Sequence, residues 1–245
     1  MRNFKVILQY EGTRYQGWQK QESTRNTIQG RLERLLSRIA QAPVQVHASG
    51  RTDAGVHALG QVANFHMDTD LTPQELMRQM NLYLPEDIGV VDICEVPERF
   101  HSRLNAKEKT YCYRVMNSEI PHIFDRRYVY VRPGKLELDA MRQAAAYLEG
   151  THDFQAFTSA KRSKKSTVRR IDSIGIRQVG DELRFTFTGN GFLFHMVRIL
   201  MGTLLEVGSG ERKPEEIPRL LENGSREQAG PLVPACGLVL VEVKY

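Results

Sequence analysis

A chain of 245 residues is long enough to bury the core of one large domain or of two small ones. Hydrophobic residues make up 41% of the chain and charged residues 26%, a composition that excludes a disordered protein or a fibrous repeat. The formal net charge of +5 favours a polyanionic partner such as a nucleic acid, but many basic proteins bind none, so charge alone leaves the partner open.

The first half of the chain is predicted to alternate strands with two helices. Apolar side chains at every second position from 4 to 10 predict a strand with one buried face. Thr72 before Pro73 is typical of a helix start, where the threonine caps the helix and the proline occupies its first turn. We expect strands at 4–10, 44–48, 62–67 and 88–96, and helices at 28–39 and 73–84. The order is β-α-β-β-α-β.

The second half repeats this order. We expect strands at 110–116, 128–131, 170–179, 183–188 and 238–243, and helices at 138–148, 192–207 and 215–221. Because the pattern restarts in a polar stretch near residue 105, the predicted domains are residues 1–105 and 106–245. These features indicate an α+β protein built of two ferredoxin-like βαββαβ halves with mostly antiparallel sheets. Sheets that join in this way offer a central cleft, which is a common place for a ligand site.

The cysteines give a first indication of the compartment. Cys94, Cys112 and Cys236 lack the paired spacing of a zinc site or a redox motif, so we expect a reduced, cytoplasmic setting. The first residues contain no apolar run with a cleavage site, and no signal peptide is expected. The longest apolar stretch, 192–207, contains a histidine and an arginine and is too short to span a bilayer, so no membrane role is expected.

Residues 50–58 place Asp53 in a glycine-flanked loop between two predicted strands. Gly50 and Gly55 allow the backbone to turn sharply, and a carboxylate on such a turn can be presented into a cleft. The alternative is that Asp53 closes an Asx-turn, which is the commoner role of an aspartate beside glycine. The loop by itself does not decide between a catalytic and a structural aspartate.

Arg198 lies in the apolar helix predicted at 192–207. Because that helix is apolar on nearly every side, it should be largely buried, and a buried guanidinium needs a carboxylate or phosphate partner. The alternative is that the aliphatic stem of Arg198 carries its charge to solvent. A paired arginine is favoured, but 29 acidic residues compete to be the partner.

Tyr111 and Tyr113 alternate in a predicted strand and therefore point to the same side. Either ring could stack on a nucleobase, although core packing is the default for such a pair. No two histidines have the spacing of metal ligands, and no HExxH motif occurs, so no metal is expected. Phosphate-binding glycine motifs are also absent, which weighs against a nucleotide cofactor.

The stretch from Gly50 to Ala58, which reads GRTDAGVHA, resembles the catalytic loop of the TruA family of tRNA pseudouridine synthases. Other segments resemble the motifs of that family in the same order over nearly the whole chain: YEGT at 10–13, GWQ at 17–19, FHSR at 100–103, KTY at 109–111, GTHDF at 150–154, GFL at 191–193, MVR at 196–198 and GL at 237–238. Glu11 departs from the family, which often has aspartate there, and the sequence of 159–166 is expected to vary.

The resemblance implies an isomerase that converts uridine to pseudouridine at positions 38, 39 and/or 40 of the tRNA anticodon arm without a cofactor. It implies that Asp53 is the catalytic nucleophile and that Arg198 holds the Asp53 carboxylate ionised. Tyr111 would lie against the target base, and Arg51 would help to hold the flipped nucleotide out of the stack. Attack at C1′, attack at C6 and a glycal route all remain open.

Further RNA contacts are expected from His101, Arg103, Lys164, Lys165 and Arg169, and the family implies a homodimer in which tRNA also contacts the second subunit.

Two other functions compete with this interpretation. A non-catalytic RNA-binding protein is one, because RRM domains share the ferredoxin-like topology, but no RNP1-like string of glycine and aromatic residues occurs here. A nucleoside glycosidase is the other, and its chemistry usually needs a second acid, which the loop around Asp53 lacks.

Overall fold

The computed structural model describes residues 1–161 and 166–245, which divide into two compact units. The first unit comprises residues 1–107 together with 239–245, and the second comprises residues 108–238.

The last strand, β10 (Leu238–Lys244), groups almost entirely with the first unit, although it was predicted to belong to the domain 106–245. Val239 lies opposite His57 in a parallel pairing with the sheet of that unit. The hydroxyl of Tyr245 donates a hydrogen bond of 2.8 Å to the carbonyl of Ser102, and its ring packs against Phe100. These contacts join segments far apart in the sequence, so no local pattern predicts them.

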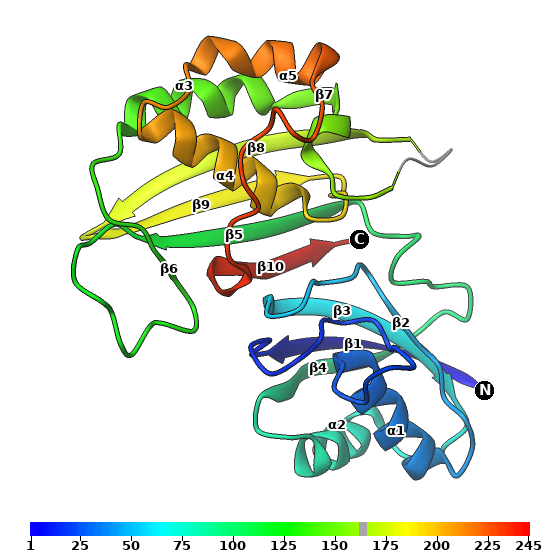
Figure 1. Ribbon diagram of the computed structural model, residues 1–245. Coiled ribbons are helices and arrows are strands. Elements are labelled where there is room, and N and C mark those ends of the chain that lie inside the picture. Colours follow the sequence, from blue (N-terminus) through cyan, green and yellow to red (C-terminus); the bar gives the residue numbers. More distant parts are fainter. Residues whose placement is uncertain (162–165) are drawn as a thin grey trace. The chain divides into compact units, whose positions relative to one another are not determined.

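The first unit is a sheet with two helices. Its elements are β1 (Arg2–Tyr10), α1 (Ile28–Ala40), β2 (Val46–Ala48), β3 (His57–Met67), α2 (Pro73–Tyr83) and β4 (Ile88–Val96). The strands run in the order β4-β1-β3 with antiparallel pairing, and β2 and β10 both pair with β3. Figure 1 shows α1 and α2 on one face of this sheet.

Local sequence explains these elements. Phe4, Val6, Leu8 and Tyr10 are each at most 4% exposed, which confirms the predicted buried face of β1. Helix α2 begins with a capping box, in which Thr72 and Glu75 satisfy each other's backbone N–H groups.

The second unit is a sheet covered by three helices. Its strands are β5 (Glu108–Met116), β6 (Tyr130–Val131), β7 (Gly150–Asp153), β8 (Val168–Val179) and β9 (Glu182–Gly189). Its helices are α3 (Leu138–Leu148), α4 (Met196–Gly208) and α5 (Ile217–Asn223), with short 3₁₀ turns at Gln155–Phe157, Pro214–Glu216 and Ala235–Gly237. The sheet order is β5-β9-β8-β7 with antiparallel pairing, and β6 adds to β5 in parallel. The helices lie on one face of it (Figure 1).

The α+β class with mostly antiparallel sheets is therefore confirmed. Three details differ from the prediction. Strand β3 begins at His57 rather than at residue 62. Helix α4 begins at Met196 rather than at residue 192, because His195 adopts a left-handed backbone with φ of 65° that cannot continue a helix. Strand β7 was not predicted, since its four residues carry no apolar alternation. Within the described residues, no helix is long and apolar enough to cross a membrane.

Candidate active site

Asp53 opens a tight turn between β2 and β3. The N–H of Val56 donates to the carbonyl of Asp53 over 3.2 Å, and Gly55, the third residue of the turn, has φ of 79°. That combination is typical of a type II turn, which needs glycine at its third position. Thr52 and Val56 are buried, while Asp53 is half-buried and Arg51 is exposed. The turn is closed by backbone atoms, so it does not require the Asx-turn that was the structural alternative for Asp53.

A buried polar network supports the turn from the side of the sheet. The hydroxyl of Ser49 donates to Gln61 Oε1 over 2.7 Å, and Gln61 Nε2 donates to the carbonyl of Gly50 over 3.0 Å. The hydroxyls of Tyr10 and Thr52 lie 2.8 Å apart. Burial raises the pKa of Tyr10 to about 12, so its hydroxyl keeps its proton at neutral pH.

Residues 12–18 hold the turn from its other side. Trp18 N–H donates to the carbonyl of Thr52 over 3.0 Å, and Gly55 N–H donates to the carbonyl of Tyr15 over 3.3 Å. The approach is close, because a Cβ at Gly12 would lie 2.0 Å from the carbonyl oxygen of Val56. The turn that carries Asp53 is therefore fixed on two sides by groups of the same unit.

Tyr111 and Tyr113 lie on β5 in the second unit, and both are buried, as expected of residues on one face. Tyr113 is fully buried and donates its hydroxyl to the carbonyl of Pro234 over 2.7 Å. Burial raises the pKa of Tyr113 well above its ordinary value, so the hydroxyl stays a donor. Tyr111 is 8% exposed, and the Phe192 ring meets it edge to face at 5.2 Å. Tyr113 thus has a structural role, and Tyr111 is the tyrosine nearer the surface.

Arg198 lies in the first turn of α4, a helix that is buried on nearly every side, as the sequence predicts. The side chain itself is half-buried. Its Nε donates to the carbonyl of Val233 over 2.8 Å. Because a guanidinium is planar, this one bond fixes the direction in which the terminal nitrogens of Arg198 point.

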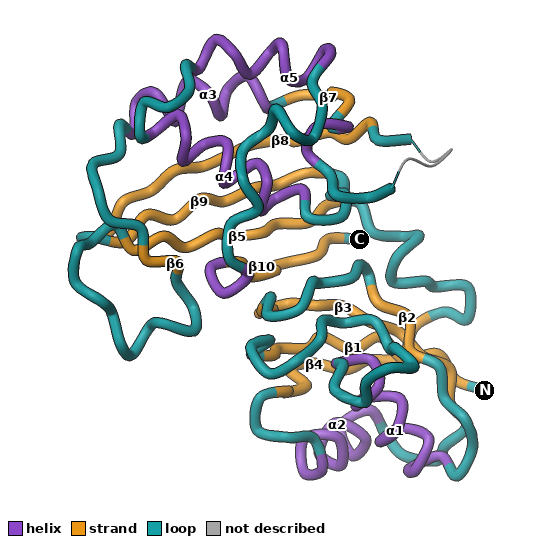
Figure 2. Tube along the Cα trace, in the orientation of Figure 1, coloured by secondary structure: helices purple, strands orange, loops and turns teal. Residues whose placement is uncertain are grey.

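The carbonyl that holds Arg198 belongs to residues 225–237, which we call the return segment. It runs from α5 back along α4, as a loop in Figure 2 until the 3₁₀ turn at Ala235–Gly237. Gly230 N–H donates to the buried Thr203 hydroxyl over 2.9 Å, and a Cβ at Gly202 would lie 2.0 Å from the carbonyl oxygen of Pro231. Tight packing against α4 thus places the carbonyl of Val233.

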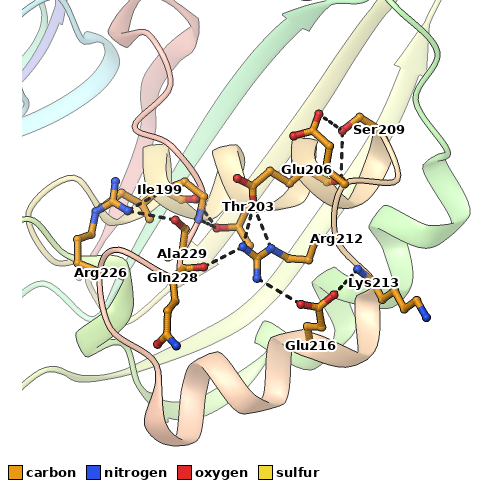
Figure 3. A network of polar contacts seen from close by, with 12 residues as sticks. Ile199, Thr203, Glu206, Ser209, Arg212, Lys213, Glu216, Arg226, Gln228 and Ala229 are labelled. Atoms are coloured by element: carbon orange, nitrogen blue, oxygen red, sulfur yellow. Dashed lines mark hydrogen bonds and ion pairs between the residues drawn. The ribbon is translucent and has the colours of Figure 1, made fainter.

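A polar network anchors the start of the return segment (Figure 3). Arg212 donates to Glu206 of α4 over 2.9 Å and to the carbonyl of Gln228 over 2.8 Å. Arg226 donates to the carbonyls of Ala229 and Gly230. This support for Arg198 was not predicted from the sequence, although Gly202 inside the apolar helix is a local sign of close backbone approach.

The predicted RNA-contact residues lie in both units. His101 is half-buried with its ring 5.1 Å from that of His47, and Arg103 is exposed, both in the first unit. In the second unit, Arg169 on β8 donates to the carbonyls of Ser166 and Val168, and its partial burial lowers its pKa. Lys164 and Lys165 lie outside the described residues.

The structure thus places Arg51 and Asp53 in one loop of the first unit, and Tyr111 and Arg198 in the second unit. The pairing of Asp53 with Arg198 stays a prediction. In the described part of the chain, no group of three or more His, Cys, Asp or Glu side chains could hold a metal ion.

A family model described as tRNA pseudouridine synthase matches residues 6–105 and 144–245. The "tRNA pseudouridine synthase A" of Bacillus sp. (strain KSM-64) is 45% identical over 245 residues, which is 100% of each chain. The "tRNA pseudouridine synthase A 1" of Clostridium tetani (strain Massachusetts / E88) is likewise 45% identical over 245 residues and 100% of each chain.

Solved structures are more distant. A chain in the crystal structure of the archaeal box H/ACA sRNP Nop10-Cbf5 complex gives a TM-score of 0.34 at 14% identity, with 93% of this chain and 60% of that chain covered.

Proposed function

Because this chain belongs to the tRNA pseudouridine synthase family, and is an isomerase that acts on tRNA, we propose that it modifies uridine 38, 39 or 40 of the anticodon arm with Asp53 as nucleophile. The target positions rest on the resemblance of residues 50–58 to the catalytic loop of the TruA family.

The geometry of the turn around Asp53 is the observation that carries this assignment. Buried hydrogen bonds hold both flanks of the turn, yet the aspartate itself keeps partial exposure. A turn held in this way keeps Asp53 in a defined position at the surface. A nucleophile needs such a position, because small errors in its placement are costly in rate.

One carboxylate suffices for the reaction. Pseudouridine formation breaks the bond between C1′ and N1, turns the uracil in place, and joins C5 to C1′. The proton on C5 is lost and N1 gains one, so the mass of the RNA does not change. The carboxylate of Asp53 attacks C1′ or C6, or removes the proton from C2′ to give a glycal. Each of these routes begins with an ionised carboxylate.

Tyr111 and Arg198 are assigned the supporting roles. Tyr111 lies against the extracted base, and its edge-to-face contact with the half-buried Phe192 supports that role, because it holds the Tyr111 ring where part of it is still exposed. Arg198 pairs with the carboxylate of Asp53, and the fixed direction of its guanidinium supports that pairing. Arg51, exposed two residues before Asp53, holds the flipped nucleotide.

The tRNA further contacts His101, Arg103 and Arg169, and the functional form is a homodimer in the cytoplasm. Arg103 is exposed, and His101 and Arg169 are half-buried, so each of the three side chains is accessible to RNA, which supports these contacts.

The test is to incubate the purified protein with an unmodified tRNA transcript and to map pseudouridine by a chemistry that marks the isomer. We expect marks only within positions 38 to 40 and no free uracil. Release of uracil would indicate a glycosidase instead, and stable binding without any change in the RNA would indicate a non-catalytic RNA-binding protein.

A further inference from the structure

Three arginines gather where helix α1 begins, and none of them has a role in the site described above. Arg25 precedes the helix, and Arg31 and Arg34 lie on its outer face, three residues apart. All three side chains are exposed. Among the described residues, no carboxylate forms an ion pair with any of them.

The fold holds these like charges close together. Arg34 donates to the carbonyl of Arg25 over 2.9 Å, and Arg31 donates to Asn26 Oδ1 over 3.0 Å. Partial burial lowers the pKa of Arg34, and the positive charges of Arg31 and Arg25 lower it further. The three positive charges therefore repel one another, and no ion pair with a carboxylate of the described residues offsets that repulsion.

Neighbouring cations of the same unit are arranged differently. Arg14 lies 2.6 Å from Asp87, Lys20 lies 3.0 Å from Glu33, and Arg2 lies 2.9 Å from Glu95. Each of these cations has a carboxylate partner in its own unit. Exposed arginines that are held close together without a carboxylate partner, while neighbouring cations each have one, are typical of a surface that binds an external anion.

The cluster is connected to the turn that carries Asp53. Gln16 N–H donates to the carbonyl of Asn26 over 2.9 Å, and Ile28 N–H donates to the carbonyl of Gly17 over 3.2 Å. A Cβ at Gly17 would lie 3.1 Å from the carbonyl carbon of Asp53. Residues 16–17 thus contact both the start of α1 and the turn that carries Asp53, so the arginine cluster and the turn are neighbours within the first unit.

The surface continues along α1. Arg34 and Arg38 line a shallow groove that the Lys20–Glu33 ion pair also borders. Helix α1 rises about 1.5 Å per residue, so Arg31 to Arg38 span about 10 Å. An elongated row of exposed forked donors fits an extended polyanion better than a compact anion, which needs an enclosed pocket.

Resting on the proposed function, we propose that Arg25, Arg31 and Arg34 bind the phosphate backbone of tRNA beside the nucleotide that Asp53 attacks. Such contacts carry no base information. They add affinity that depends on salt and fix the register of the RNA on the first unit.

The experiment measures binding of an unmodified tRNA transcript at several salt concentrations, for the wild type and for Arg25→Gln/Arg31→Gln/Arg34→Gln. Loss of three phosphate contacts should flatten the slope of log affinity against log salt by about 2 to 3, and should weaken binding at low salt by about tenfold or more. A matched variant, Arg142→Gln/Arg177→Gln/Arg219→Gln, removes three exposed arginines of the second unit and should bind like the wild type. The three residues changed to lysine should keep most of the slope.

Two substrates locate the phosphates. The proposal places them beside the nucleotide that Asp53 attacks, so the isolated anticodon stem-loop should show the same loss of affinity as the whole tRNA. A loss that is seen only with the whole tRNA would contradict that placement. An unchanged slope with both substrates would overturn the proposal, and so would an equal loss in the matched variant. Conversion of tRNA by the wild type, measured in the same samples, reports separately on the proposed function.

Discussion

Alanine at Gly12 should displace the turn that carries Asp53 without removing any side chain proposed to touch the substrate. The added Cβ would lie 2.0 Å from the oxygen and 2.6 Å from the carbon of the Val56 carbonyl. Both atoms are backbone, so no rotamer change relieves the clash, and the two segments must separate by about 1 Å or more. A misplacement of about 1 Å can cost about a hundredfold in rate. We therefore expect turnover to fall by about two orders of magnitude.

The assay is single-turnover formation of pseudouridine at saturating tRNA, beside thermal melts and tRNA binding. Gly89→Ala is the matched control, because a Cβ at Gly89 meets nothing within 4 Å in the same unit. It should react and melt like the wild type or slightly better, since alanine restricts the unfolded chain. Turnover of Gly12→Ala within about threefold of the wild type would refute the claim that residues 12–18 position Asp53.

Three further outcomes are expected. If the phenol of Tyr111 helps to remove the C5 proton, Tyr111→Phe should bind tRNA normally but release little pseudouridine. Tyr111→Ala should in addition lose about 1 to 3 kcal/mol of binding free energy. A Phe variant with wild-type yield and rate would show that the phenol has no part in the mechanism. Thr203→Val leaves the N–H of Gly230 without its acceptor, so it should lower both the melting temperature and the turnover, while Thr203→Ser should restore both. A lower melting temperature with normal turnover would show that the return segment does not position Arg198. Hydrogen bonds from Arg114 lower the pKa of Glu182 from 4.5 to about 2, so its stabilisation is present above pH 4.5 and is lost as the pH falls towards 2. The melting-temperature deficit of Glu182→Gln should accordingly shrink over that range, and a deficit that does not change with pH would contradict the ion pair as its cause.

Local interactions made much of the fold predictable. The Thr72, Pro73 and Glu75 capping arrangement of α2 is complete within four residues, so the sequence alone places the start of that helix. The alternation in β1 likewise reports its buried face directly. By contrast, the apolar residues just before Met196 continue a helical pattern although the backbone at His195 is left-handed, because hydrophobic periodicity does not register a backbone break.

The candidate site was likewise predictable only where its features are local in the sequence. The glycines around Asp53 indicated a sharp turn, and the apolar surroundings of Arg198 indicated a partner. The hydrogen bond from Ser49 to Gln61 spans 12 positions, and that between Tyr10 and Thr52 spans 42, so no local pattern contains them. A backbone carbonyl, such as that of Val233, which accepts the hydrogen bond from Nε of Arg198, leaves no signature in the sequence.

The central claim is that Asp53 is the nucleophile, and the most direct test is single-turnover pseudouridine formation by Asp53→Asn beside Asp68→Asn, an exposed aspartate of the same unit. The amide of asparagine keeps the shape of the turn but cannot act as the carboxylate does. We expect Asp53→Asn to bind tRNA like the wild type and to lose several orders of magnitude in rate, while Asp68→Asn reacts normally. Pseudouridine formation by Asp53→Asn within about tenfold of the wild-type rate would contradict the account.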